Sequence, residues 1–399
     1  MELHRDGATT FFAHSNFRNR PQRFGIKRQD RLLHIYVIGK TGTGKSTLLE
    51  SFMRQDVERG EGFALLDPHG DLVERIARSI PDHRKDDVVY LDATDPKQPY
   101  GYNPLKRVAA DKRPLAASGL LEVFHKAWGD RAWGQRMEHI LRNALLALLD
   151  HPEATIADTL RLFRDSAYRK EVAEGAQNRQ VRDFWLHEFP NYSYRYRAEA
   201  LAPIQNKVGA FLAIPSIARI VGDAPTPISL RRLMDEGKIL LVNLARGKLG
   251  EDATALLGGL LVTNIGLAAF SRADIPADGR RLFFVYLDEF QYFTTLSVAN
   301  MIAELRKYGV GLVLANQYLA QLSDDVRHAV LGNAGTIISF RVGPEDAAVL
   351  AKEFDPKFRA VDLLTLPNHR IYLKLMIEGA PSKPFSAETV TPADVAAPR

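Results

Sequence analysis

The 399-residue sequence predicts an α/β fold in which a mostly parallel central sheet is interrupted by an inserted all-helical domain. Two observations lead to this prediction. Short apolar runs recur between helix-prone stretches, as expected for parallel strands that are covered by helices on both faces. Between residues 107 and 227 the apolar spacing changes to that of an amphipathic helix. This spacing is shown by Met137, Ile140, Leu141, Ala144, Leu145 and Leu148.

Seven apolar runs are expected to be strands of the sheet. They cover residues 35–38, 63–66, 88–91, 239–244, 282–287, 310–314 and 336–340. Ligands of parallel sheets bind beyond the carboxyl ends of the strands. The residues expected at that edge are Gly39, Asp67, Asp92, Asn243, Asp288 and Gln317. A final run, residues 371–377, is expected to add an edge strand.

The most informative stretch joins the first apolar run to the first helix. It fits the pattern G-x-x-x-x-G-K-[ST] of a phosphate-binding P-loop, with a strand before it and a helix after it. Its glycines allow backbone N–H groups to face phosphate oxygens, and the start of the helix adds its positive dipole end. The expected cofactor-binding residues are Gly39, Thr41, Gly42, Thr43, Gly44, Lys45, Ser46 and Thr47. Lys45 is expected to reach the β- and γ-phosphates of ATP, and Ser46 to bind Mg²⁺. An incidental glycine-rich turn is the alternative, which the strand and helix on either side argue against.

Two carboxylates follow a second apolar run. Asp288 and Glu289 come directly after residues 282–287, as if a buried strand delivered both to the phosphates. Asp288 is expected to hold Mg²⁺, and Glu289 to orient and deprotonate the attacking water. The alternative is an ordinary acidic turn at a strand end.

The next strand is flanked by two further candidates for catalysis. Gln317 follows it, where an amide can bond the γ-phosphate or the water. Arg306 precedes it, on the far side from its own nucleotide, which suits an arginine finger that enters the site of a neighbouring subunit. A solvated charge at a helix end is the alternative for Arg306.

Composition narrows the class of protein further. The chain is 46% apolar and 25% charged with a net charge of +5, and these are ordinary values for a globular protein. It has no cysteine, which excludes disulfides, thiol nucleophiles and cysteine zinc sites. No secretory signal is seen, and the most apolar run, residues 255–270, is expected to be a buried helix, so no intrinsic membrane span is predicted.

The expected domains are an N-terminal arm (1–30), a RecA-like ATPase domain in two parts (31–106 and 228–380), the all-α insertion (107–227) and an extended tail (381–399). The arm is interpreted either as packing on a neighbouring molecule or as a loosely ordered lead-in to the first strand.

Residues 191–197, in which tyrosines alternate with arginines, are the local candidate for DNA contact. Ordinary packing of the tyrosines is the alternative. The loop 246–248 is a candidate for lining a pore.

The chain resembles the coupling-protein ATPases of conjugative type IV secretion (the TraD/TraG group), within the HerA/FtsK superfamily of P-loop proteins. The matching stretches include residues 38–46, 67–71, 102–105, 206–209, 243–252, 287–291, 306–309, 316–321 and 340–346. The resemblance implies a homo-hexamer that pumps DNA through its pore. It also carries the catalytic roles over to Lys45, Asp288, Glu289, Gln317 and Arg306.

Membrane-anchored coupling proteins have transmembrane helices before the ATPase domain, and this sequence shows none. We therefore expect a cytoplasmic protein, with peripheral attachment at the inner face of the membrane as the alternative. Relaxase or secretion-channel proteins are the candidate protein partners.

Two other functions remain open. One is a HerA-like helicase that processes DNA ends, and the other is a non-motor module whose assembly is switched by ATP. The strandedness of the DNA is not determined by the sequence.

Overall fold

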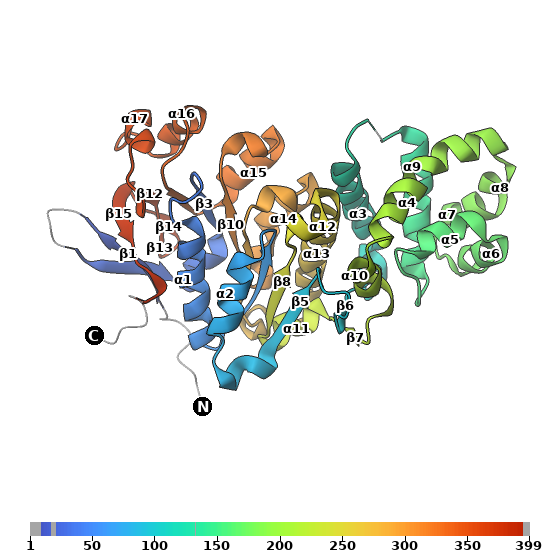
Figure 1. The fold of residues 1–399 in the computed structure, drawn as a ribbon, viewed down its shortest axis with the longest axis horizontal. Helices are drawn as coiled ribbons and strands as arrows, with labels where there is room; N and C mark the ends of the chain where they lie inside the picture. The colour runs from blue at the N-terminus through green and yellow to red at the C-terminus, as the bar shows by residue number, and fades with distance from the viewer. Residues whose placement is uncertain (1–8, 17–20, 132, 394–399) are drawn as a thin grey trace.

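The computed structural model describes residues 9–16, 21–131 and 133–393. Its centre is an 11-stranded sheet in the order β2-β1-β15-β12-β11-β3-β10-β9-β4-β8-β5 (Figure 1). The parallel part contains β3 (Ile35–Ile38), β4 (Gly62–Asp67), β5 (Val88–Asp92), β8 (Ile239–Asn243), β9 (Phe283–Leu287), β10 (Val310–Asn316) and β11 (Thr336–Ser339). All seven predicted strands are present, so the α/β fold with a mostly parallel sheet is confirmed.

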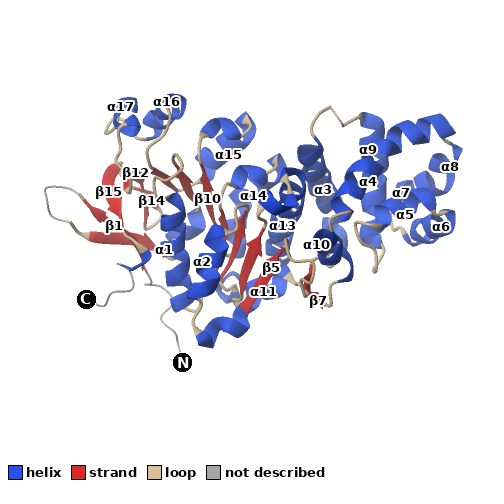
Figure 2. Cartoon of the chain, in the orientation of Figure 1, coloured by secondary structure: helices blue, strands red, loops and turns tan. Residues whose placement is uncertain are grey.

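Helices cover both faces of the sheet (Figure 2). Alternate residues of β3 point to opposite faces, because successive side chains of a strand do so. Ile35 and Val37 belong to the core beneath α1 (Lys45–Glu58) and α2 (Asp71–Ser79). Tyr36 and Ile38 belong to the core that contains α13 (Glu251–Ser271) and α14 (Leu296–Leu305). The continuous apolar runs therefore reflect burial on both faces.

The insertion between β6 (Tyr100–Gly101) and β7 (Thr226–Pro227) is mostly helical. Its helices are α3 (Arg113–Trp128), α4 (Gln135–Asp150), α5 (Asp158–Arg164), α6 (Ser166–Gly175), α7 (Arg179–Asp183), α8 (Phe189–Asn191), α9 (Tyr194–Leu212) and α10 (Pro215–Ala218). The amphipathic spacing predicted over residues 137–148 is the buried face of α4. Figure 1 shows α4 to α9 gathered at the end of the molecule away from β1 and β15. Because β6 pairs with β7, the chain enters and leaves this segment at adjacent points.

The remaining helices of the α/β part are short. They are α11 (Leu230–Glu236), α12 (Arg246–Leu249), α15 (Asp324–Asn333), α16 (Pro344–Glu353) and α17 (Ala360–Leu364).

The outer edge of the sheet differs from the prediction. The run 371–377 was expected to form an edge strand, but β12 (Arg370–Lys374) lies inside the sheet, antiparallel to both β11 and β15 (Phe385–Thr389). Beyond β15 come β1 (Thr9–Ser15) and β2 (Arg23–Lys27). Without β15, the outer edge of β12 would expose a row of backbone donors and acceptors, and β15 pairs with these groups.

Strand β1 pairs with β15 of the same chain and β2 pairs with β1, so the described part of the arm is not a loosely ordered lead-in to β3. Packing of the arm on a neighbouring molecule stays a prediction. The tail also contributes β14 (Ala380–Pro381), which pairs with β13 (Met376–Ile377) in a separate ribbon.

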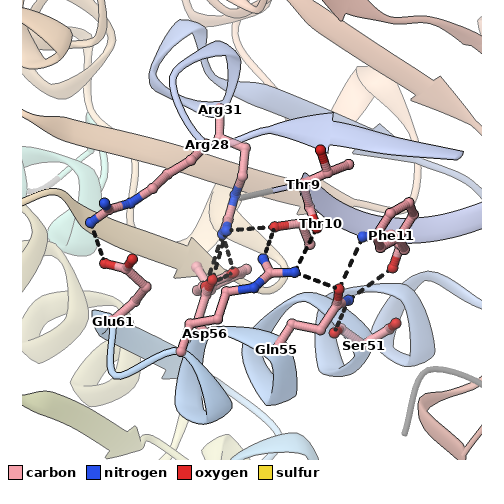
Figure 3. Close-up of polar contacts among 11 residues, drawn as sticks. Thr9, Thr10, Phe11, Arg28, Arg31, Ser51, Gln55, Asp56 and Glu61 are labelled. Carbon is pink, nitrogen blue, oxygen red and sulfur yellow. Dashed lines mark hydrogen bonds and ion pairs between the residues drawn. The ribbon is translucent and has the colours of Figure 1, made fainter. Parts of the chain in front are cut away.

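A buried ion pair ties the N-terminal strand to the centre of the fold (Figure 3). The Arg31 guanidinium, which precedes β3, donates to both carboxylate oxygens of Asp56 on α1, at 2.6 and 2.8 Å. It also donates to Thr10 of β1 and to the Tyr286 hydroxyl of β9, and it lies 3.6 Å from the centre of the Phe284 ring. Burial opposes the charge on Arg31, but Asp56 outweighs it, and the net effect raises the pKa of Arg31. One guanidinium thus joins β1, α1, β3 and β9.

Helix α13 is the apolar segment that the sequence predicted to be buried. By length and composition it could cross a membrane, yet 83% of its most apolar window is buried within the protein. It packs against α3, α11 and α14. Its apolar character is accounted for by this central position in the core.

Candidate nucleotide-binding site

The register of the parallel strands brings the predicted site residues to one edge. Asn316 of β10 pairs with Ile38 of β3, and Leu287 of β9 pairs with Leu66 of β4. The residues that follow these strand ends therefore meet above the sheet. They are Gly39, Asp67, Asp288 and Gln317.

The loop between β3 and α1 has the shape of a phosphate cradle. Gly44 has φ of +120°, a conformation that favours glycine, and a Cβ there would lie 3.0 Å from Nδ1 of His369. At Gly39 a Cβ would lie 2.5 Å from the Cβ of Phe340, so any side chain would push the loop away from β11. The Lys45 amine donates to the carbonyl oxygen of Gly39 at 2.6 Å, and its burial lowers the pKa of Lys45. The loop thus keeps a cation and the start of α1 above the sheet.

Most of the predicted residues line one cavity of about 240 Å³ at this edge. Its lining residues are Thr41, Gly42, Gly44, Lys45, Ser46, Thr47, His69, Asp288, Glu289, Gln317 and His369. Gly39 and Thr43 are not among these lining residues, but both make hydrogen bonds within the loop. The Gly39 carbonyl accepts from Lys45, and the Thr43 hydroxyl donates to the carbonyl of Lys40 at 2.7 Å.

Asp288 and Ser46 converge on the floor of this cavity. The Ser46 hydroxyl donates to Oδ2 of Asp288 at 3.3 Å. Burial, together with the charges of Asp67 and Glu289, raises the pKa of Asp288 to about 7 despite Lys45. The carboxylate oxygens of Asp67 accept hydrogen bonds from the backbone N–H groups of His69, Leu72 and Val73. A carboxylate and a hydroxyl that lack a full counter-charge are a fitting pair of ligands for Mg²⁺, whose charge would favour the ionised Asp288.

Glu289 lines the cavity, and its carboxylate is held by two amides. Gln317 donates to one of its carboxylate oxygens at 2.8 Å and Gln291 donates to the other at 2.9 Å. Gln317 also accepts from the Thr41 hydroxyl at 3.1 Å, so the water-activating candidate is linked to the P-loop. Glu289 has φ of +48°, which is unusual for a residue with a side chain and marks a backbone that its surroundings constrain.

The residues present therefore fit ATP with Mg²⁺. Backbone donors and Lys45 would bind the phosphates, Ser46 and Asp288 would hold the metal ion, and Glu289 faces the same space.

Sequence reasoning missed two residues of this site. His369 lines the cavity, and its backbone N–H donates to the carbonyl of Thr43 at 2.9 Å. No local pattern could have revealed it, since it meets the P-loop only because β12 begins beside the end of β11. Gln291 was within the acidic stretch, but its contact with Glu289 depends on the turn after β9.

Arg306 does not belong to this cavity. It is exposed in the turn between α14 and β10, at the opposite end of the strands. There it lines a hollow of about 530 Å³ together with Lys307, Lys27 and Asp30. This position agrees with the expectation that Arg306 lies far from its own nucleotide.

The residues of the DNA-contact candidate, 191–197, lie in different environments, some packed and some exposed. Tyr192 and Tyr196 pack against each other with ring centres 4.5 Å apart and ring planes tilted by 48°, which is ordinary packing. Tyr194, at the start of α9, is 83% exposed. Arg195 beside it pairs with Glu199 of the same helix.

The fold and the site together define a P-loop NTPase of RecA-like architecture. The family model described as the type IV secretion-system coupling protein DNA-binding domain matches residues 25–354, and this chain belongs to that family. Among curated proteins, none matches the chain in sequence.

Solved structures of related fold agree with this assignment. The plasmid coupling protein TrwB in complex with the non-hydrolysable GTP analogue GDPNP is 17% identical, with a TM-score of 0.64, and the match covers 98% of this chain and 90% of that one. TrwB in complex with ADP and Mg²⁺ is 17% identical with a TM-score of 0.63, again over 98% and 90% of the two chains. VirB4 of Thermoanaerobacter pseudethanolicus is 14% identical with a TM-score of 0.64, and 97% of each chain is covered. These likenesses establish the shared fold.

Proposed function

We propose that this protein is an ATP-hydrolysing DNA translocase that works as a homo-hexameric ring and moves DNA through its central pore. One observation carries the enzymatic part. The Glu289 carboxylate is held by Gln317 and Gln291 in the lining of a cavity that Lys45 and Asp288 also line. A protein that only binds nucleotide has no need for a carboxylate positioned in this way.

The residues of the chain divide the hydrolysis between them. Lys45 and the backbone N–H groups of the P-loop bind the β- and γ-phosphates, and Gln317 orients Glu289 toward the water. Glu289 accepts a proton as the water oxygen bonds to the γ-phosphorus, and the bond from that phosphorus to the β–γ bridging oxygen breaks. ADP and inorganic phosphate leave. Mg²⁺ at Ser46 and Asp288 would supply positive charge to the phosphate oxygens.

The ring and the DNA are further parts of the proposal. Membership of the coupling-protein family supports both, and the position of Arg306 supports the ring, because an exposed arginine at the far end of the strands suits the site of the next subunit. Tyr194 in the helical segment and Lys248 in α12 are exposed candidates for contact with DNA.

Two replacements separate binding from hydrolysis. Lys45→Ala should abolish tight ATP binding, since the phosphates lose their counter-charge. Glu289→Gln should bind a fluorescent ATP analogue normally and release no phosphate. Glu74→Gln, which removes a charge from an exposed ion pair on α2, is the matched control and should behave as wild type. Equal phosphate release by Glu289→Gln and wild type would exclude the role of Glu289.

DNA binding should rest mainly on phosphates, as a pump that ignores sequence requires. The logarithm of the affinity should therefore fall in proportion to the logarithm of the salt concentration. This slope can be measured on synthetic single strands and duplexes of two unrelated sequences. An affinity that is insensitive to salt, or that depends strongly on sequence, would contradict a translocase.

A further inference from the structure

Helix α3 is the point at which the helical segment touches the catalytic layer. It packs along α13 and against α14, and it is the first α-helix of the insertion. Two polar side chains on its inner side, Glu122 and Lys126, contact the chain that follows β9.

Lys126 closes the turn that carries the water-activating candidate. Its amine donates to the carbonyl oxygen of Gln291 and, at 2.5 Å, to that of Thr294. Gln291 in turn donates from its side chain to Glu289. Only one residue therefore separates Lys126 from the catalytic carboxylate.

The turn needs such support because its backbone is constrained. Glu289 has φ of +48°, and residues with side chains keep this conformation only when the surrounding structure imposes it. The Phe290 carbonyl is already bonded by the backbone and hydroxyl of Thr294. Lys126 occupies the carbonyls of Gln291 and Thr294, so the turn is held from the side of the helical segment.

The environment of the Lys126 amine is consistent with a role in the turn. The residue as a whole is exposed, but its amine bonds the two carbonyls, and desolvation by the surrounding protein lowers the pKa of Lys126 to about 8. Among the ion pairs of the described residues, none includes Lys126, whereas Lys106 pairs with Glu153 and Lys207 with Asp252. A lysine that only solubilised the surface would not bond two carbonyls of a catalytic turn.

Glu122 makes the second contact, one helical turn earlier. Its carboxylate accepts from the backbone N–H of Ser297 at 2.7 Å and from the Ser297 hydroxyl at 2.6 Å. Ser297 lies in the first turn of α14, where backbone donors lack partners within the helix. Helix α14 ends at Leu305, directly before Arg306. The same face of α3 thus contacts both the catalytic turn and the helix that precedes the arginine finger.

We propose that α3 couples the helical segment to hydrolysis, with Lys126 positioning Glu289 and Glu122 positioning α14 with its Arg306. This proposal rests on the proposed ATPase function. A displacement of the helical segment by bound DNA would reach the subunit's own carboxylate through Lys126. It would reach the neighbour's site through Glu122 and α14.

The test compares Lys126→Met, which keeps the stem and removes the donors, with Lys126→Arg, which keeps donors. Lys106→Met is the matched control, because its amine pairs with a surface carboxylate. Misplacing a catalytic group by about 1 Å can cost on the order of 100-fold in rate. For Lys126→Met we therefore expect kcat to fall roughly 10- to 100-fold while KM for ATP and the midpoint of thermal unfolding stay close to wild type. Lys126→Arg should recover most of the rate.

Two results would overturn the role of Lys126. One is an unchanged kcat in Lys126→Met, and the other is an equal loss in Lys126→Arg, which would show that the donors are irrelevant. Glu122→Ala tests the other contact if Lys126→Met fails to fold. By itself, the Glu122→Ala variant should have a lower kcat. It should regain activity when mixed with Lys45→Ala subunits, because its defect lies in the position of Arg306, which acts on the site of a neighbouring subunit. Full activity of Glu122→Ala by itself would overturn the second half of the proposal.

The failure of this inference is distinct from that of the proposed function. If Glu289→Gln is inactive and Lys126→Met is normal, only the coupling through α3 is wrong. If Glu289→Gln hydrolyses ATP as wild type does, the assignment of the active site is wrong.

Discussion

The buried pair of Arg31 and Asp56 leads to a quantitative prediction about stability. The side chain of Arg31 is 1% exposed and that of Asp56 is fully buried. Replacing Arg31 with methionine keeps most of the stem that packs on Phe284, but it leaves a carboxylate buried without its partner. The Tyr286 hydroxyl, which donates to Asp56 at 2.5 Å, is the one strong donor that remains.

Removing one partner of a buried ion pair typically costs about 3–5 kcal/mol. Spread over 399 residues in one cooperative transition, a loss of about 4 kcal/mol lowers the unfolding midpoint by about 5 °C. The triple replacement Arg31→Met, Asp56→Leu and Tyr286→Phe removes the orphaned polar groups together. It should regain most of this loss, since buried pairs are often replaceable by apolar side chains of similar volume.

The measurement is the free energy of unfolding in urea, followed by circular dichroism and tryptophan fluorescence. Arg78→Met is the control, because it breaks an exposed ion pair with Glu74 and should leave stability nearly unchanged. A free energy for Arg31→Met within about 1 kcal/mol of wild type would refute the reasoning. So would a triple variant that is no more stable than Arg31→Met.

Two further predictions concern the ring and the dependence of stability on pH. Arg306→Ala and Lys45→Ala should each be inactive alone, and mixing the two variants should restore activity at roughly a quarter of the interfaces if Arg306 acts on a neighbour. Action in trans would be excluded if subunits exchange without recovery of activity and if activity falls linearly as wild type is diluted with mutant. His34 is buried, accepts from the Leu312 N–H and bonds the Ile302 carbonyl, and burial lowers its pKa to about 4. Since the unfolded chain then binds the extra proton between pH 6.5 and 4, the stability that neutral His34 provides should be lost over that range as pH falls, by at most about 3 kcal/mol. The difference in unfolding free energy between wild type and His34→Gln should therefore shrink as the pH falls through this range. His328→Gln, an exposed control on α15, should show no such trend. A difference for His34→Gln that does not vary with pH would contradict the stabilising role of neutral His34.

Much of the site could be predicted because its elements are local in the sequence. The P-loop needs glycines, a lysine and a serine at set spacing between a strand and a helix, and Lys45 and Ser46 lie where that pattern puts them. Asp288 and Glu289 were predictable for a similar reason, since they follow a buried strand directly. Their catalytic roles, like the limits of the domains and the role of Arg306, stay predictions.

The contacts around Glu289 were beyond sequence analysis. Gln291 and Gln317 reach its two oxygens only because the turn after β9 folds back and because β10 lies next to β9. His369 reaches the P-loop from more than 320 residues away. Such contacts depend on the order of strands in the sheet, which apolar runs do not encode.

The outer edge of the sheet illustrates the same limit. The sequence correctly indicated a strand near Ile371, but placing it at the edge required that nothing else pair with it. Strands β1 and β15 come from the two ends of the chain, and the sequence pattern of neither identifies the strand with which it pairs. Pairing was decided by backbone groups that would otherwise have been exposed.

By itself, therefore, the sequence determined the class of fold, the helical insertion and most of the residues that line the cavity above the sheet, because strand and helix periodicity and the P-loop spacing are local properties. Only the tertiary structure decided that Arg31 joins four elements, that the chain ends complete the sheet, and that Lys126 and Glu122 of α3 contact the turn after β9 and α14. These contacts join residues between 25 and more than 350 positions apart, and burial and hydrogen bonding select them only after the chain has folded.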